Sequence, residues 1–69
     1  MGLDICVILS FFDGHKDTFF TNTFYLDDDG IFYVGDEKTF EIYDISSFLV
    51  YPSTYVIAHY QEFKENGIM

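Results

Sequence analysis

The sequence predicts an α+β fold, an antiparallel β-meander of about four strands with one C-terminal helix. Segments in which apolar and polar residues alternate are separated by short turns that contain glycine, which is typical of antiparallel strands. The chain is 49% apolar and 22% aromatic, which is enough for a packed core. Pro52 then precedes residues with helical spacing. With 69 residues, we expect a single acidic domain, residues 1–69.

Residues 3–11 and 18–26 are the first two predicted strands. Apolar side chains alternate in the first, and the second is rich in Thr, Phe and Tyr, which favour strands. Residues 12–17 form a turn between them, because their Asp-Gly pair supplies a residue that tolerates positive φ.

Residues 31–34 and 39–43 form the next predicted hairpin. The acidic turn at 27–30 precedes it, and Gly-Asp-Glu-Lys at 35–38 joins its two strands. A four-residue loop would pair Val34 with Thr39, and a two-residue Gly-Asp loop would keep the same core face. This register places four side chains on the core face: Ile31, Tyr33, Phe40 and Ile42.

The C-terminal third is less regular. Residues 44–51 suit either a further strand or an irregular connection. From Ser53 onward, apolar residues recur at helical spacing, Ser53 is a suitable N-cap, and Asn66-Gly67 is a suitable end. The residues at 55–57 would also suit a strand, so that alternative stays open.

A domain of this length has little stability to spare, because it buries only about 60% of the surface of the unfolded chain. Disulfides, metal ions or oligomerisation usually support such domains. Cys6 is the single cysteine, which excludes an internal disulfide and fits a reducing cytoplasm. Cysteines and histidines are also too few for a structural zinc site. We therefore expect a homodimer that covers excess apolar surface.

The net charge of −9 argues against direct binding to nucleic acid or to an anionic membrane, since both would repel the chain. The N-terminal segment lacks the basic residues of a signal peptide. Its apolar run at 5–9 is far too short to span a bilayer. We therefore expect a soluble cytoplasmic protein.

The Asp-Asp-Asp-Gly sequence at 27–30 invites comparison with a calcium-binding EF-hand loop. With Gly30 at loop position 6, position 1 falls on Tyr25, and position 12 falls on Asp36 instead of the usual glutamate. The flanking segments also indicate strands instead of helices. We therefore expect no metal site and no cofactor.

The sequence also gives little indication of a catalytic site. Cys6 alternates to the outer face of the first strand, and His15 and His59 lie in a turn and in the predicted helix. Their spacing does not indicate a nucleophile beside a base. We expect no catalytic residue and no enzymatic activity.

Acidic residues concentrate in residues 26–44, which hold seven of the twelve acids and one of the three lysines. Self-repulsion costs stability, so this concentration favours a role in binding. Alternate residues of a strand lie roughly 6.6–6.8 Å apart, about the separation of successive phosphates along one DNA strand. The predicted partner-binding residues are Asp27, Asp28, Asp29, Asp36, Glu37, Glu41 and Asp44.

These acids predict a DNA mimic, in which carboxylates occupy the phosphate-binding surface of a basic DNA-binding protein. The alternative is a solvated acidic face that keeps an unrelated interaction module soluble and protects its edge strands. In that case the aromatic surface would carry the binding.

In length, net charge, aromatic content and lack of motifs, the chain resembles the small early proteins that lytic phages use against host machinery. Among them it is most similar to the acidic DNA mimics that inhibit the bacterial nucleoid protein HU. The resemblance covers the whole chain but includes no residue-by-residue match. It implies a dimeric, mostly β inhibitor that occupies the DNA-binding surface of HU in the host cytoplasm. Host RNA polymerase, a restriction enzyme or a CRISPR complex would be targets of the same physical kind.

Overall fold

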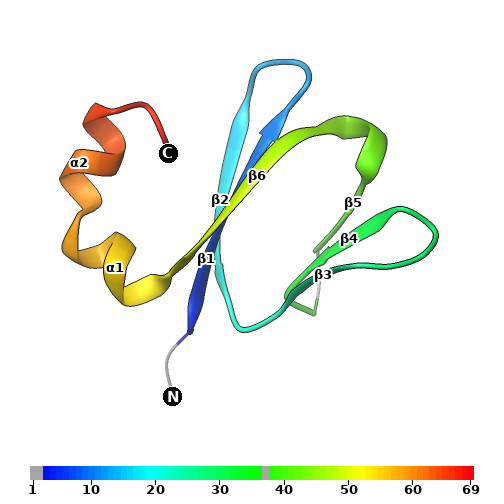
Figure 1. The fold of residues 1–69 in the computed structure, drawn as a ribbon, viewed down its shortest axis with the longest axis horizontal. Helices are drawn as coiled ribbons and strands as arrows, with labels where there is room; N and C mark the ends of the chain where they lie inside the picture. The colour runs from blue at the N-terminus through cyan, green and yellow to red at the C-terminus, as the bar shows by residue number, and fades with distance from the viewer. Residues whose placement is uncertain (1–2, 37) are drawn as a thin grey trace.

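The computed structural model describes residues 3–36 and 38–69, which fold into two three-stranded antiparallel sheets and two short α-helices (Figure 1). The α+β class is therefore confirmed. Sheet A has the strand order β2-β1-β6 and sheet B the order β3-β4-β5. The strands are β1 (Ile5–Phe11), β2 (Lys16–Thr21), β3 (Phe24–Leu26), β4 (Ile31–Val34), β5 (Lys38–Glu41) and β6 (Ile45–Pro52). The helices are the 3-10 helix η1 (Ile42–Asp44), α1 (Ser53–Ala58) and α2 (Tyr60–Glu65).

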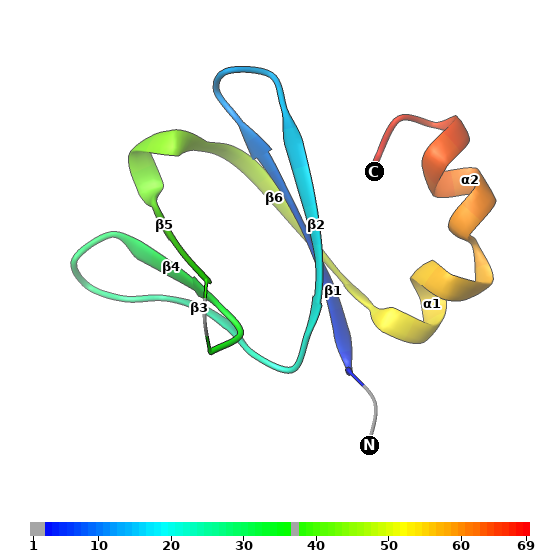
Figure 2. The same ribbon diagram turned by 180° about the vertical axis from the view of Figure 1, so that it is seen from behind.

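The three layers of the molecule are the helices, sheet A and sheet B, with sheet A in the middle (Figures 1 and 2). Strand β1 is the centre of sheet A and is buried on both faces along residues 6–9, which explains why these four residues are all apolar. Val7 and Leu9 face sheet B, where they pack in one core cluster with Phe32. Cys6 and Ile8 form a second cluster with the helices. The prediction that Cys6 lies on an outer face was wrong, because the helices cover that face.

The predicted single meander was wrong in detail, because residues 18–26 are not one strand. Strand β2 ends at Thr21 in sheet A, and β3 begins at Phe24 in sheet B. Both faces of this segment are partly apolar, so its two halves can each form a strand of a different sheet. At the break, the side chain of Asn22 accepts a 2.8 Å hydrogen bond from the backbone N–H of Asp4.

The predicted register of the second hairpin was also wrong. Val34 pairs with Lys38, and three residues instead of four separate β4 from β5. A shift of one residue exchanges the two faces of a strand, so Phe32 and Val34 are buried, whereas Ile31 and Tyr33 are only half-buried. Of the predicted core face, Ile42 is exposed and belongs to η1, and the half-buried Phe40 packs against the core.

The segment 44–51, for which two alternatives were open, is largely strand β6. The single predicted helix is interrupted at His59, whose φ of −119° leaves the helical range and separates α1 from α2. Ser53 is not an N-cap. It is the first residue of α1, and its hydroxyl donates a hydrogen bond to the carbonyl of Leu3, which ties the helix to the N-terminal segment.

The predicted end of the helix at Asn66-Gly67 agrees with the structure. Gly67 has a φ of +71°, and its N–H donates to the carbonyl of Lys64. The N–H of Ile68 donates to the carbonyl of Phe63, which completes the glycine-based helix end. No helix in the described part of the chain is long and apolar enough to cross a membrane.

Candidate partner-binding surface

The 3-10 helix η1 brings together acidic segments that are distant in the sequence. The N–H of Ile42 donates a 2.8 Å hydrogen bond to the carbonyl of Gly30, which holds η1 against the β3–β4 turn. The N–H of Phe12 donates a 3.2 Å hydrogen bond to the carbonyl of Asp44, which holds η1 against the β1–β2 turn. Figure 1 shows η1 between these two turns. We call six carboxylates in or directly beside these segments the acidic rim: Asp13, Asp17, Asp28, Asp29, Glu41 and Asp44.

Asp27, the first of the predicted binding residues, is bonded within its own turn. Its Oδ1 accepts hydrogen bonds from the N–H groups of Asp29 (2.9 Å) and Ile31 (3.0 Å). Its Oδ2 accepts a 2.9 Å hydrogen bond from the hydroxyl of Tyr33. These bonds, that of Ile31 foremost, hold the pKa of Asp27 below its usual value, and the same carboxylate raises the pKa of Tyr33. Asp27 therefore shapes the turn that exposes its acidic neighbours.

The seven predicted residues do not gather at one place. Asp28, Asp29, Glu41 and Asp44 lie in the acidic rim, near Asp27. Asp36 is exposed in the turn at the opposite end of β4, where it lines a hollow of about 300 Å³. Glu37 lies outside the described residues. The single line of carboxylates expected from the sequence is thus divided between the two ends of β4.

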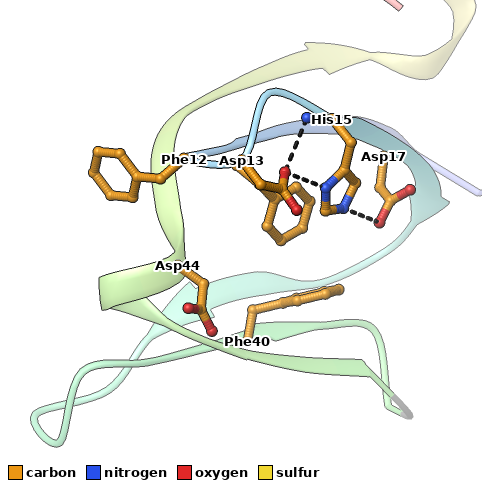
Figure 3. A pocket seen from close by; sticks show the side chains of 7 residues that line it. Phe12, Asp13, His15, Asp17, Phe40 and Asp44 are labelled. Atoms are coloured by element: carbon orange, nitrogen blue, oxygen red, sulfur yellow. Dashed lines mark hydrogen bonds and ion pairs between the residues drawn. The ribbon is translucent and has the colours of Figure 1, made fainter.

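An open hollow of about 530 Å³ lies between the β1–β2 turn, β5 and η1 (Figure 3). The ring of His15 stacks on Phe11, with 4.1 Å between centroids and 7° between planes. Its Nδ1 is hydrogen-bonded to Asp13 Oδ1, and its Nε2 lies 3.7 Å from Asp17 Oδ2. The hollow therefore combines aromatic walls with carboxylates. Its lining residues are Phe11, Phe12, Asp13, His15, Asp17, Phe40 and Asp44.

The carboxylate of Asp13 is held in its charged form. Its pKa is lowered first by the hydrogen bond from the backbone N–H of His15 (3.0 Å) and second by the imidazole of the same residue. Sequence reasoning placed His15 in a turn between Asp13 and Asp17 but gave these residues no role. The contact of η1 with the turn adds Asp44, and no local pattern indicates that contact.

Lysine side chains do not compensate the acidic rim. Lys16 donates a hydrogen bond to the carbonyl of Gly67, and the ammonium of Lys64 lies 5.4 Å from the centre of the Tyr60 ring. Within residues 3–36 and 38–69, the ion pairs are the two that His15 makes, and these require its protonation. The rim is therefore strongly negative and open to an external cation.

Of the three groups considered for catalysis, His15 lies among the rim carboxylates, whereas Cys6 and His59 lie apart from the rim. Cys6 is fully buried, and burial raises the pKa of its thiol, which disfavours the reactive thiolate. The Nδ1 of His59 is 2.9 Å from the carbonyl oxygen of Tyr55 in α1. Among the residues that the structure describes, no three or more His, Cys, Asp or Glu side chains are arranged to hold a metal ion.

Comparisons of the chain with protein-family models, with curated proteins and with solved structures find no match. The fold alone does not determine a function, because one architecture supports many activities. The surface itself must therefore carry the functional inference.

Proposed function

We propose that this chain is a DNA-mimicking inhibitor, which presents its acidic rim to a basic DNA-binding protein and blocks that protein's access to DNA. The observation that carries the proposal is the absence of lysine partners for the rim within the described residues. Uncompensated like charge costs folding stability, and a basic partner removes that cost. A surface that normally holds phosphates supplies the lysine and arginine side chains required.

The favoured target is the bacterial nucleoid protein HU, on the basis of the resemblance in size and charge. In this proposal the chain acts as a homodimer in the host bacterial cytoplasm. It acts by occupying a surface, without catalysis, a metal ion or a cofactor.

The hollow beside His15 supports the proposal, because it suits one basic side chain of the partner. A guanidinium group stacks on aromatic faces and forms paired hydrogen bonds with carboxylates. Phe11 and Phe40 supply aromatic rings, and Asp13 and Asp44 supply carboxylates. Complementary charge of this kind raises the association rate, and the partly desolvated contact slows dissociation.

A second candidate is an interaction module that binds another host protein, such as RNA polymerase, through aromatic residues. Phe12 and Tyr43 favour it, because these aromatic residues are 72% and 82% exposed. Aromatic residues of this kind often anchor protein interfaces. In this reading the carboxylates keep the surface soluble and add little affinity.

A displacement experiment tests the proposal. A fluorescent DNA duplex bound to purified HU is titrated with the chain at low salt, and release is followed by anisotropy. A bacterial lysate is passed over immobilised chain in parallel, and the proteins that elute at high salt are identified. We expect release of the duplex, or capture of another basic protein from which the chain displaces DNA. Failure of both contradicts the proposal.

A further inference from the structure

Strand β6 is the one long edge strand in the described part of the molecule that carries no charge. It forms an outer edge of sheet A, and no strand among residues 3–36 and 38–69 pairs with its free side. The edge strands β2 and β5 both contain charged residues, and β3 is only three residues long. From Ile45 to Tyr60, the sequence has no acid and no lysine, although the chain has a net charge of −9.

The hydrogen-bond pattern identifies the backbone groups at this free edge. The N–H of Ser53 donates to the carbonyl of Asp4 (3.0 Å), and the register between β1 and β6 continues unshifted from there to Leu49. Bonded and non-bonded residue pairs alternate in an antiparallel ladder. Leu49 therefore bonds to β1, whereas Phe48 and Val50 direct their N–H and C=O groups toward the open edge.

The side chains of this segment are exposed as well. Phe48, Leu49 and Val50 are 46%, 44% and 43% exposed. The free segment has defined ends, because the register shifts opposite Ser10 and Phe11, and Pro52 has no N–H to donate. An apolar edge of this length with unpaired backbone groups is a template for pairing with another strand.

We infer that β6 pairs antiparallel with β6 of a second copy of this chain, about a two-fold axis at Leu49. Phe48 of each copy then exchanges backbone hydrogen bonds with Val50 of the other, and the two Leu49 side chains meet at the axis. The two copies of sheet A become one continuous sheet. A symmetric contact of this kind closes on itself and leaves no further β6 edge free.

Charge favours a second copy as the occupant. Two chains of charge −9 repel at most contacts, but the β6 segment brings no charged side chain to the axis. The nearest acid along β6 is Asp44, and antiparallel pairing places its two copies ten residues apart. That separation is roughly 30 Å, several times the screening length of about 8 Å at physiological salt. A basic partner, by contrast, gains nothing from a neutral strand.

This interface specifies the homodimer of the proposed function, but it does not depend on binding to a basic protein. The acidic rims remain uncovered at the two ends of the joined sheets. Salt separates the two ideas, because pairing through β6 is apolar and should persist as salt rises, whereas binding through the rims should weaken.

The test uses sedimentation equilibrium of the purified chain alone, at a concentration of about 50 μM so that a weak dimer is populated. We expect a mass about twice 8.1 kDa at both low and high salt. Leu49→Glu places two like charges at the axis, and we expect at least a tenfold weaker dimer. The matched control is Ile57→Glu on α1, where the residue is 67% exposed, and this variant should remain dimeric. A monomeric parent, or a Leu49→Glu variant that dimerises as the parent does, overturns the inference.

Amide hydrogen exchange of the unmodified chain gives a second test that requires no folded variant. In the dimer the amides of Phe48 and Val50 are bonded across the axis, so their exchange should slow at least tenfold between dilute and concentrated samples. The amide of Leu49 bonds to β1 in either state and should change much less. Concentration-independent exchange at both Phe48 and Val50 contradicts pairing at this edge.

Discussion

The backbone N–H of Ile42 donates a 2.8 Å hydrogen bond to the carbonyl of Gly30, which joins the 3-10 helix η1 to the acidic β3–β4 turn. Gly30 has a φ of +81°, and a Cβ at this position would lie 3.1 Å from Cγ2 of Ile42. Glycine therefore permits both the turn and the close approach of η1. The acidic rim depends on this contact, because η1 carries Asp44 and follows Glu41.

Gly30→Ala should destabilise the fold by about 1–3 kcal/mol, because an L-residue is strained at positive φ and the added methyl group crowds Ile42. Gly14→Ala is the matched control, since Gly14 has a φ of +98° but nothing within 4 Å of the added Cβ. Gly14→Ala should therefore lose only the part of the stability that is due to the strained positive φ. Urea denaturation measures both. A loss that is no larger at Gly30 than at Gly14 shows that the contact with Ile42 is unimportant.

Asp27→Asn should lower the melting temperature at pH 7, because the charged carboxylate accepts three hydrogen bonds. The folded pKa of Asp27 is depressed below its unfolded value of about 3.9. Its stabilising contribution is therefore complete above that value and is lost as pH falls through the folded pKa. The difference in melting temperature between parent and variant should shrink accordingly in acid. Asp28→Asn, at the exposed neighbour, should show little change at either pH.

Cys6 should resist thiol reagents in the native protein, because it is fully buried and its pKa is raised. An aromatic disulfide reagent at pH 8 should label the denatured chain at least a hundredfold faster than the native chain. Cys6→Ala should cost about 1 kcal/mol of stability and leave displacement of DNA unchanged. Rapid labelling of the native protein, or a loss of function in a folded Cys6→Ala variant, would favour a chemical role for the thiol.

Local patterns in the sequence were sufficient for several elements of the fold. The alternation in β1 and the glycine turns depend on neighbouring residues alone, and Gly14 and Gly67 both have positive φ as their turn sequences indicate. The register of the β4–β5 hairpin could not be predicted in this way. A loop that is longer or shorter by one residue changes this register. Both faces of residues 31–34 are apolar, so the sequence does not indicate which face is buried.

The same limit applies to the candidate site. The sequence showed that acidic residues are concentrated in residues 26–44. The acidic rim, however, forms through tertiary contacts of η1 with two turns, which the sequence does not indicate. Asp13 and Asp17 were missed for this reason, because they lie outside the acidic segment of the sequence. Asp27 was expected to bind a partner. Its bond from the N–H of Asp29 is instead that of an Asx turn, in which an aspartate side chain accepts from the backbone two residues on.

Removal of charge from the rim is the decisive test of the proposed function. The triple variant Asp28→Asn, Asp29→Asn, Asp44→Asn deletes three exposed carboxylates and nearly preserves side-chain shape. It should fold at least as stably as the parent, because repulsion falls. Its displacement of DNA from the basic target should weaken at least several-fold, and the remaining binding should depend less on salt. The matched control, Asp4→Asn with Glu62→Gln and Glu65→Gln, also deletes three exposed carboxylates but lies outside the rim, so it should change displacement much less. A triple variant that displaces DNA as well as the parent shows that the rim is only a solvated face, and exposed aromatic residues such as Tyr43 then become the binding surface to test.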